Sequence, residues 1–173
     1  MFPAHFPIKL PGLPRLAEVP APLVRLFGAM PTLPVSAVFV ALFNRLAWRA
    51  LKDLDWATIH GKRFCVHVRD LGIKSYFSLG TAGLRPEMAD HADVTFTATA
   101  RDFTRLALRL EDPDTLFFNR RLLIEGNTDL GLTVKNMLDA VEFDSLLAGM
   151  PAPVAKIITT MRNRLAQEST ESL

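Results

Sequence analysis

The sequence predicts an α+β fold in which a mixed or antiparallel sheet is covered on one face by helices. Short stretches that alternate apolar and polar residues are typical of strands with one covered face. Longer stretches that repeat apolar residues every three or four positions are typical of helices. The sheet is expected from about Arg63 to Ala100 and from Leu122 to Glu125, and the helices near residues 35–54, 102–110 and 129–143.

Composition favours one domain. The chain has 173 residues, of which 49% are hydrophobic, which is enough to bury a core. A single cysteine, Cys65, excludes an intrachain disulfide framework and a cysteine-based zinc cluster. The apolar run from Val38 to Phe43 falls far short of the roughly 20 residues that span a bilayer, and the first residues lack the pattern of a signal peptide. We therefore expect a cytoplasmic protein.

The N-terminal segment, residues 1–34, is rich in proline and in basic residues. Eight of the 12 prolines lie in it, so residues 1–22 are expected to be extended. Between Pro22 and Pro31 a two-turn helix is possible, and so short a helix needs a surface to lie on. Its candidate membrane-contact residues are Leu23, Arg25, Leu26 and Phe27.

Charge supports this membrane contact. Residues 1–52 hold six Lys or Arg against a single acid, and the rest of the chain is net acidic. A basic, apolar front end predicts contact with anionic lipid headgroups, peripherally at the inner membrane. Nucleic acid is not expected as a partner, because the basic residues form no stripe interleaved with aromatic residues.

The first expected helix of the domain spans residues 35–54 and follows Pro34. Its apolar stripe is expected to be buried, while Arg45, Arg49 and Lys52 face water. The stripe consists of Val35, Val38, Phe39, Leu42, Phe43, Leu46 and Leu51.

The strands follow. Phe64, Val66 and Val68 alternate with Cys65, His67 and Arg69, and Gly72 turns the chain into a second strand from Lys74 to Leu79. The stretch from Asp93 to Ala100 repeats the alternation, with Val94, Phe96 and Ala98 on the covered side and threonines on the solvated side.

The second half of the domain continues this pattern. Asp102 is expected to open a helix with Arg101, Arg105 and Arg109 outside, and residues 112–114 to form a turn. After the strand from Leu122 to Glu125, the turn residues 126–128 lead into the helix 129–143. Residues 148–173 are expected to form a C-terminal helix with a polar, frayed tail.

No catalytic or metal site is expected, and no cofactor. The four histidines lie far apart in the sequence, without carboxylates at metal-ligand spacing, and the glycine-containing turns fit neither phosphate-loop pattern. His67 follows Cys65 on the same face of one strand, which leaves a Cys–His pair open as a minor alternative. The sequence thus favours a protein that is not an enzyme.

Two blocks of sequence carry a resemblance to a known family. The run RRLLIEGNTDLGL, followed at once by VKNMLDAV, and the run DVTFTATARDF resemble the sterol-carrier-protein type-two (SCP-2) lipid-binding domain. The fit is best to its bacterial branch of ubiquinone biosynthesis accessory factors. The resemblance covers roughly residues 35–147, which divides the chain into an N-terminal extension of residues 1–34, this domain, and a C-terminal part of residues 148–173.

The resemblance implies an apolar tunnel between the sheet and the helices. Each of its expected wall residues could equally be plain core. They are Phe64, Val66, Val68, Val94, Phe96, Leu130, Val134, Met137 and Leu138. Arg120 and Arg121 are expected either to hold an anionic headgroup at the mouth of the tunnel or to pair with Glu125 and Asp114 as surface ions.

The resemblance also implies a function. The protein would be a non-catalytic accessory factor of ubiquinone biosynthesis, in its oxygen-independent branch. It would hold an isoprenoid quinone intermediate or a phospholipid and present it to other ubiquinone biosynthesis proteins. Two alternatives remain open at this point: a general phospholipid or fatty-acyl carrier at the membrane surface, and a substrate-presenting domain with no lipid of its own.

Overall fold

The computed structural model describes residues 32–88 and 90–170 of the chain. Its strands are β1 (Arg63–Val68), β2 (Ile73–Gly80), β3 (Gly83–Pro86), β4 (Val94–Ala98) and β5 (Leu123–Gly126). Its helices are α2 (Thr32–Leu46), α3 (Trp48–Leu51), α4 (Ala100–Ala107), α5 (Pro113–Phe118), α6 (Thr128–Asp139), α7 (Phe143–Ala148) and α8 (Ala152–Thr170), with a 3-10 turn at Ala57–Ile59.

The strands form one mixed sheet in the order β3-β2-β1-β4-β5. β1 and β4 are parallel, and the other neighbours are antiparallel. Phe64 in the central strand pairs with Phe77 of β2 on one side and with Val94 of β4 on the other. These three side chains therefore lie on the same face, because paired residues project to the same side of a sheet.

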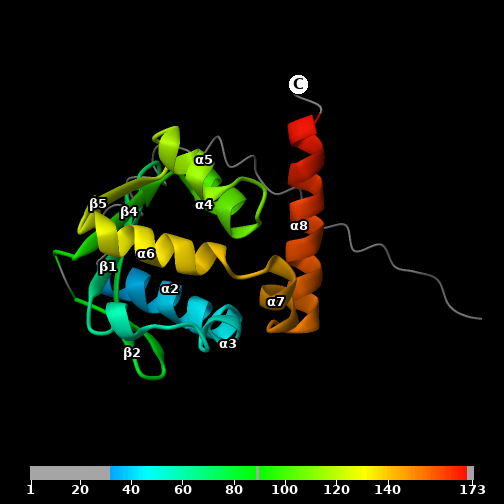
Figure 1. Ribbon diagram of the computed structural model, residues 1–173. Helices are drawn as coiled ribbons and strands as arrows, with labels where there is room; N and C mark the ends of the chain where they lie inside the picture. Colours follow the sequence, from blue (N-terminus) through cyan, green and yellow to red (C-terminus); the bar gives the residue numbers. More distant parts are fainter. Residues whose placement is uncertain (1–31, 89, 171–173) are drawn as a thin grey trace, which may run out of the picture.

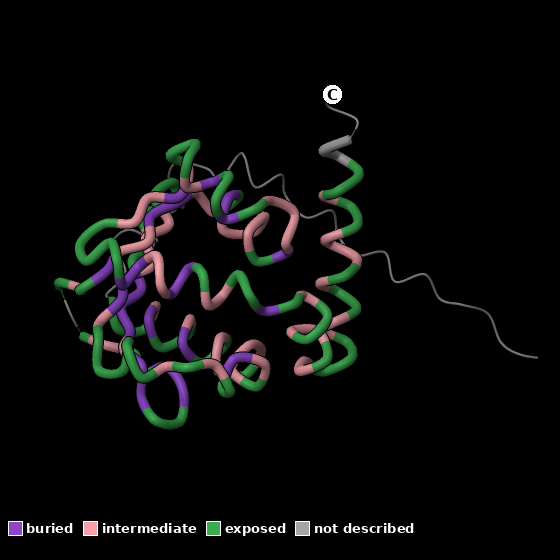
Figure 2. Tube along the Cα trace, in the orientation of Figure 1, coloured by how far each residue is buried: buried purple, intermediate pink, exposed green. Residues whose placement is uncertain are grey.

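Helices cover this face, as expected (Figure 1). α2 packs over β2 and β3, and α6 packs over β4 and β5, with α6 lying between α2–α3 and α4–α5. Figure 2 shows buried residues concentrated on the strands and on the helix sides that face them. The main core consists of Val40, Ile59, Phe64, Phe77, Leu79, Leu84, Val94, Leu130 and Val134.

α2 begins three residues earlier than expected and turns a different side to the sheet. Pro34 is accommodated because it lies in the first turn, where backbone N–H groups have no intrahelical acceptor. Val38 and Leu42, expected on the buried stripe, are 61% and 54% exposed. Ser36 is buried instead. Its hydroxyl is satisfied there, because it donates to the carbonyl oxygen of Thr32 and accepts from the N–H of Tyr76, both at 2.8 Å.

The region after β4 also differs in detail. Thr99, and not Asp102, caps α4, since its Oγ1 accepts from the N–H of Asp102 at 3.1 Å. Where only a turn was expected, Asp112 caps the short helix α5, with Pro113 in its first turn. Arg109, expected to face water, instead reaches the end of α6.

The strand, turn and helix that close the domain are confirmed within a few residues. The side chain of Asn127 caps α6 by accepting from the N–H of Leu130 at 3.1 Å. α6 ends at Asp139, and residues 143–148 form the separate helix α7. α8 lies beside α7, away from the sheet, and none of its described side chains is buried (Figures 1 and 2).

Candidate functional site

The inner face of the sheet, meaning the face toward α2 and α6, is covered unequally along the strands. At one end Phe64 is 3% and Val94 is 0% exposed. Further along the same strands Val66 and Phe96 are only half-buried. The inner face therefore has a closed end at Phe64 and Val94 and an apolar, half-buried stretch at Val66 and Phe96, which we call the half-open end. On β4, Ala98 beyond this stretch is again only 1% exposed and packs with Leu116 and Leu122.

The expected wall residues divide in the same way. Phe64, Val94, Leu130 and Val134 belong to the main core, and Val66, Phe96 and Leu138 pack against it while partly exposed. Val68 and Met137 are half-buried as well. The structure thus brings these strand and helix residues onto one interface.

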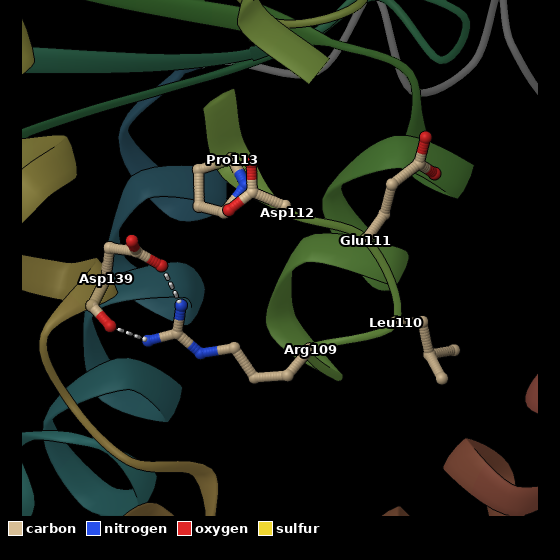
Figure 3. Close-up of a pocket in the computed structure, with 6 residues that line it drawn as sticks. All are labelled: Arg109, Leu110, Glu111, Asp112, Pro113 and Asp139. Atoms are coloured by element: carbon tan, nitrogen blue, oxygen red, sulfur yellow. Dashed lines mark hydrogen bonds and ion pairs between the residues drawn. The ribbon is translucent and has the colours of Figure 1, made fainter. Parts of the chain in front are cut away.

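Core side chains pack between the sheet and the covering helices. Two hollows, of about 250 and 540 Å³, lie elsewhere and open to solvent. Both are lined by Arg109 and Asp139. Figure 3 shows the first, in which the Arg109 side chain extends to Asp139 while Leu110 points away. A hydrocarbon chain that enters this packed interface has to displace core side chains or a covering helix.

α6 is the covering helix with polar contacts on its outer side. Gly131 sits tightly on the sheet, because a Cβ at this position would lie inside the van der Waals contact of Ile124 Cγ2 and 3.1 Å from Val94 Cγ1. Further along α6, Lys135 is 8% exposed and pairs with Asp114 at the start of α5. At the end of α6, Arg109 donates to the carbonyl oxygens of Leu138, Asp139 and Val141.

Arg120 and Arg121 have different surroundings. Arg120 is exposed, with a φ of 56°, and Arg121 forms ion pairs with Asp102 and Glu111 rather than with the acids considered from the sequence. Asp102 is 4% exposed. Burial alone would raise the pKa of its carboxyl, but the hydrogen bonds from Thr99 and Arg121 and the charge of Arg121 outweigh burial and hold that pKa below its usual value.

The opposite face of the sheet carries the Cys65 and His67 side chains. Burial raises the pKa of the Cys65 thiol, which is 1% exposed, so the thiol stays protonated near neutral pH. Partial burial, with the charge of Lys74, lowers the pKa of His67. Neither group has the ionisation that a thiolate–imidazolium pair requires. Among the described residues, no three His, Cys, Asp or Glu side chains lie together as metal ligands would.

Three residues with unusual surroundings were not singled out by the sequence. Arg109 and Lys135 contact partners 21 to 32 residues away, which local periodicity does not reveal. Ser75 lies on the inner face of β2, is 2% exposed, and its Oγ has no hydrogen-bond partner among the described residues. The position of Ser75 in an alternating strand was the available signal, since it places a hydroxyl on the apolar side.

The candidate membrane-contact residues Leu23, Arg25, Leu26 and Phe27 lie outside the described residues. In the part of the chain that the structure does describe, no helix combines the length and the hydropathy needed to cross a bilayer.

Comparison with known proteins gives concordant results. The model of the SCP-2 sterol transfer family matches residues 43–139. The ubiquinone biosynthesis accessory factor UbiT of Escherichia coli (strain K12) is 38% identical over 132 residues, which cover 72% of this chain and 76% of UbiT.

Solved structures align with this chain at lower identity. A UbiJ-SCP2 ubiquinone synthesis protein is 21% identical, with a TM-score of 0.46 over 63% of this chain and 96% of that one. Sterol carrier protein 2 like 2 from Aedes aegypti is 10% identical, with a TM-score of 0.42 over 60% of this chain and 96% of that one.

Proposed function

Because the chain belongs to the SCP-2 sterol transfer family, we propose that it is a non-catalytic, lipid-binding accessory factor of ubiquinone biosynthesis. The family and its bacterial accessory-factor branch, both expected from the sequence, are confirmed. The similarity to UbiT over most of both chains is the observation that carries the proposal. In more detail, we propose that the protein acts in the oxygen-independent branch of the pathway. There it holds a polyprenylated quinone precursor or a phospholipid and presents it to partner enzymes.

The inner face of the sheet is the site proposed for the apolar chain. Each CH₂ group moved out of water contributes about 0.8 kcal/mol, so a long prenyl or acyl chain leaves a bilayer only for a dry, apolar surface of similar extent. The half-buried residues Val66, Val68, Phe96 and Leu138 offer the start of such a surface. The fully buried Phe64 and Val94 lie at its far end.

Entry of the chain requires the C-terminal half of α6 to move. Gly131 keeps the first half of α6 close to Ile124 and Val94, so that half is the fixed part. The second half carries Met137 and Leu138, which are only half-buried, and polar contacts hold it from the side. We propose that α6 pivots near Gly131 and that the chain slides between Leu138 and the sheet.

Arg120 is proposed to meet an anionic headgroup, since it is exposed near the end of α5. Arg121 can contribute only if it exchanges one of its two carboxylate partners. Exchange of Arg120 for Ala is then expected to lower binding of anionic but not of zwitterionic lipid vesicles.

A peripheral membrane location is proposed for residues 1–34. Liposome flotation tests it, with vesicles that contain 30% phosphatidylglycerol and with chains that include or lack these residues. Loss of flotation in the shorter chain supports the contact. Equal flotation of both chains contradicts it.

Mass spectrometry of an organic extract tests the function. The protein is purified from a bacterial host grown without oxygen, and its extract is compared with that of an unrelated protein of similar size. Polyprenylated phenols or quinone precursors support the proposal. Phospholipids alone support lipid binding but favour a general lipid carrier over a carrier of quinone precursors. An extract without lipid overturns lipid binding altogether.

A further inference from the structure

Ser75 carries a buried hydroxyl that has no hydrogen-bond partner in the part of the chain that the structure describes. By the alternation of β2 it lies on the same side as Phe77 and Leu79, which belong to the core under α2 and α6. Its cross-strand partner on β1 is the half-buried Val66. The hydroxyl therefore lies beside the half-open end of the inner face.

One hydroxyl close in the structure to β2 already has partners of its own. The Ser36 hydroxyl, which contacts the next residue of β2, uses its hydrogen on the carbonyl oxygen of Thr32 and accepts the N–H of Tyr76. A buried hydroxyl that forms no hydrogen bond costs free energy, and native structures retain few such groups. An unpaired hydroxyl at this place therefore points to a partner other than the described residues, and a bound ligand is one such partner.

We propose that Ser75 donates a hydrogen bond to an oxygen atom of the lipid held on the inner face. This inference rests on the function proposed above and adds the chemical class of the ligand. The ligand has an apolar tail and a hydrogen-bond acceptor oxygen next to it, which enters the interface together with the tail. A phenol or quinone ring oxygen and the ester carbonyl of a phospholipid both have this chemistry.

The test compares ligands that share a tail and differ in oxygen. The probe is diphenylhexatriene, a hydrocarbon whose fluorescence rises in an apolar site, and its displacement measures the affinity of competitors. The competitors are decylbenzene, which has no oxygen, decylubiquinone, and didecanoyl phosphatidylglycerol. The proteins are the full chain with Ser75, Ser75→Ala and Ser75→Thr, and Ser78→Ala as the matched control. Ser78 lies on the same strand, on the opposite face, and donates to Glu87 at 2.5 Å.

For Ser75→Ala we expect an affinity for the oxygen-containing ligand that is about threefold to tenfold lower, the effect of one lost hydrogen bond. Its affinity for decylbenzene is unchanged, Ser75→Thr restores the wild-type value, and Ser78→Ala changes nothing. A selective loss for decylubiquinone assigns the oxygen to the quinone ring. A selective loss for the phospholipid assigns it to the ester.

Two results overturn the inference in distinguishable ways. Equal changes for decylbenzene and for both oxygen-containing ligands, or no change for any of them, show that Ser75 makes no hydrogen bond to ligand, while lipid binding itself stands. Failure of the wild-type chain to take up diphenylhexatriene or decylbenzene removes the apolar site, and with it the proposed function.

Discussion

Arg109 Nη1 lies 2.7 Å from Asp139 Oδ1, so a residue just after α4 binds the C-terminal end of α6. The same guanidinium donates to the carbonyl oxygen of Val141 at 2.7 Å. A helix leaves its last four carbonyl oxygens without intrahelical donors, and here one arginine from a distant segment donates to two of them, those of Leu138 and Asp139. This contact is the main restraint that we identify on the half of α6 that we propose to move.

Removal of this side chain is expected to loosen the end of α6. For Arg109→Ala we predict faster amide hydrogen exchange in residues 136–143, with little change in β1 and β4, and a loss of about 1–3 kcal/mol in the free energy of unfolding. Hydrogen-exchange mass spectrometry with peptides from α6 measures the first effect. The control is Arg101→Ala on the exposed side of α4. Unchanged exchange in residues 136–143 would show that Arg109 does not restrain α6.

The backbone of Arg109 allows a second comparison. Its φ of 53° lies in the left-handed region, which is costly for residues other than glycine. Arg109→Gly removes the same side chain contacts as Arg109→Ala but relieves this backbone. We therefore expect the glycine variant to be more stable than the alanine variant by about 0.5–1 kcal/mol in urea unfolding. Equal stabilities, or the reverse order, would contradict this.

Replacing Lys135 and replacing Asp114 should change the free energy of unfolding by different amounts. The Lys135 side chain is 7% exposed and that of Asp114 is 55% exposed. Asp114→Ala leaves a buried ammonium group unpaired and should cost about 1–3 kcal/mol. Lys135→Met leaves a carboxylate that water can solvate, so its stability should be near that of the wild type or higher. Urea unfolding of both variants decides the order, and a larger loss for Lys135→Met would refute the explanation.

Gly131 should resist substitution although it lies inside a helix. Alanine usually stabilises a helix interior by about 1 kcal/mol relative to glycine. Here its methyl group would overlap Ile124 and push α6 off the sheet. We predict a net loss of about 1–3 kcal/mol for Gly131→Ala. Ile124→Ala in the same chain should recover part of it, because it removes the atoms that overlap. A thermal melt of the single and double variants tests the coupling.

The lowered pKa of the Asp102 carboxyl predicts that the stability of the fold depends on pH. Its pKa is lower in the folded state than the unfolded value of about 3.9. The ionised carboxylate therefore stabilises the fold above about pH 4, and the contribution is lost as the pH falls through the folded pKa. Asp102→Asn should be less stable than the wild type by about 1.5–3 kcal/mol at pH 7. This difference should shrink below pH 4, whereas the exposed control Asp53→Asn should show none. A difference that is constant from pH 7 to pH 3 would contradict the assignment.

The strands and the closing helix were predictable because their patterns are local. The alternation around Phe64 and Val94 identifies the face that α2 and α6 cover, and the Gly126–Asn127 turn marks the start of α6. The short elements β3, α5 and α7 were missed because runs of four to six residues carry too little periodicity. No strong local sequence pattern predicts these short elements. The same holds for the rotation of α2 that buries Ser36.

Periodicity assigned the strand and helix residues to their faces, whereas their role as the wall of a lipid site came from the resemblance and stays a prediction. Residues such as Val66 and Leu138 share one interface as predicted, yet whether that interface is packed or open depends on how closely α6 approaches the sheet. That distance depends on Gly131, on Arg109 and on Lys135. The last two act through partners that are remote in sequence. The Arg121 pairs with Asp102 and Glu111 were missed for the same reason.

The most direct test is the molar ratio of lipid to protein in organic extracts of the wild type and of Val66→Phe. The added ring fills the half-open end of the inner face without placing a charge there, and circular dichroism verifies that the variant is folded. His67→Phe on the opposite face is the matched control. We predict close to one apolar-tailed lipid per chain for the wild type and the control, and a strongly reduced ratio for Val66→Phe. A wild-type chain without lipid, or a variant that retains the full amount, would contradict binding at this face.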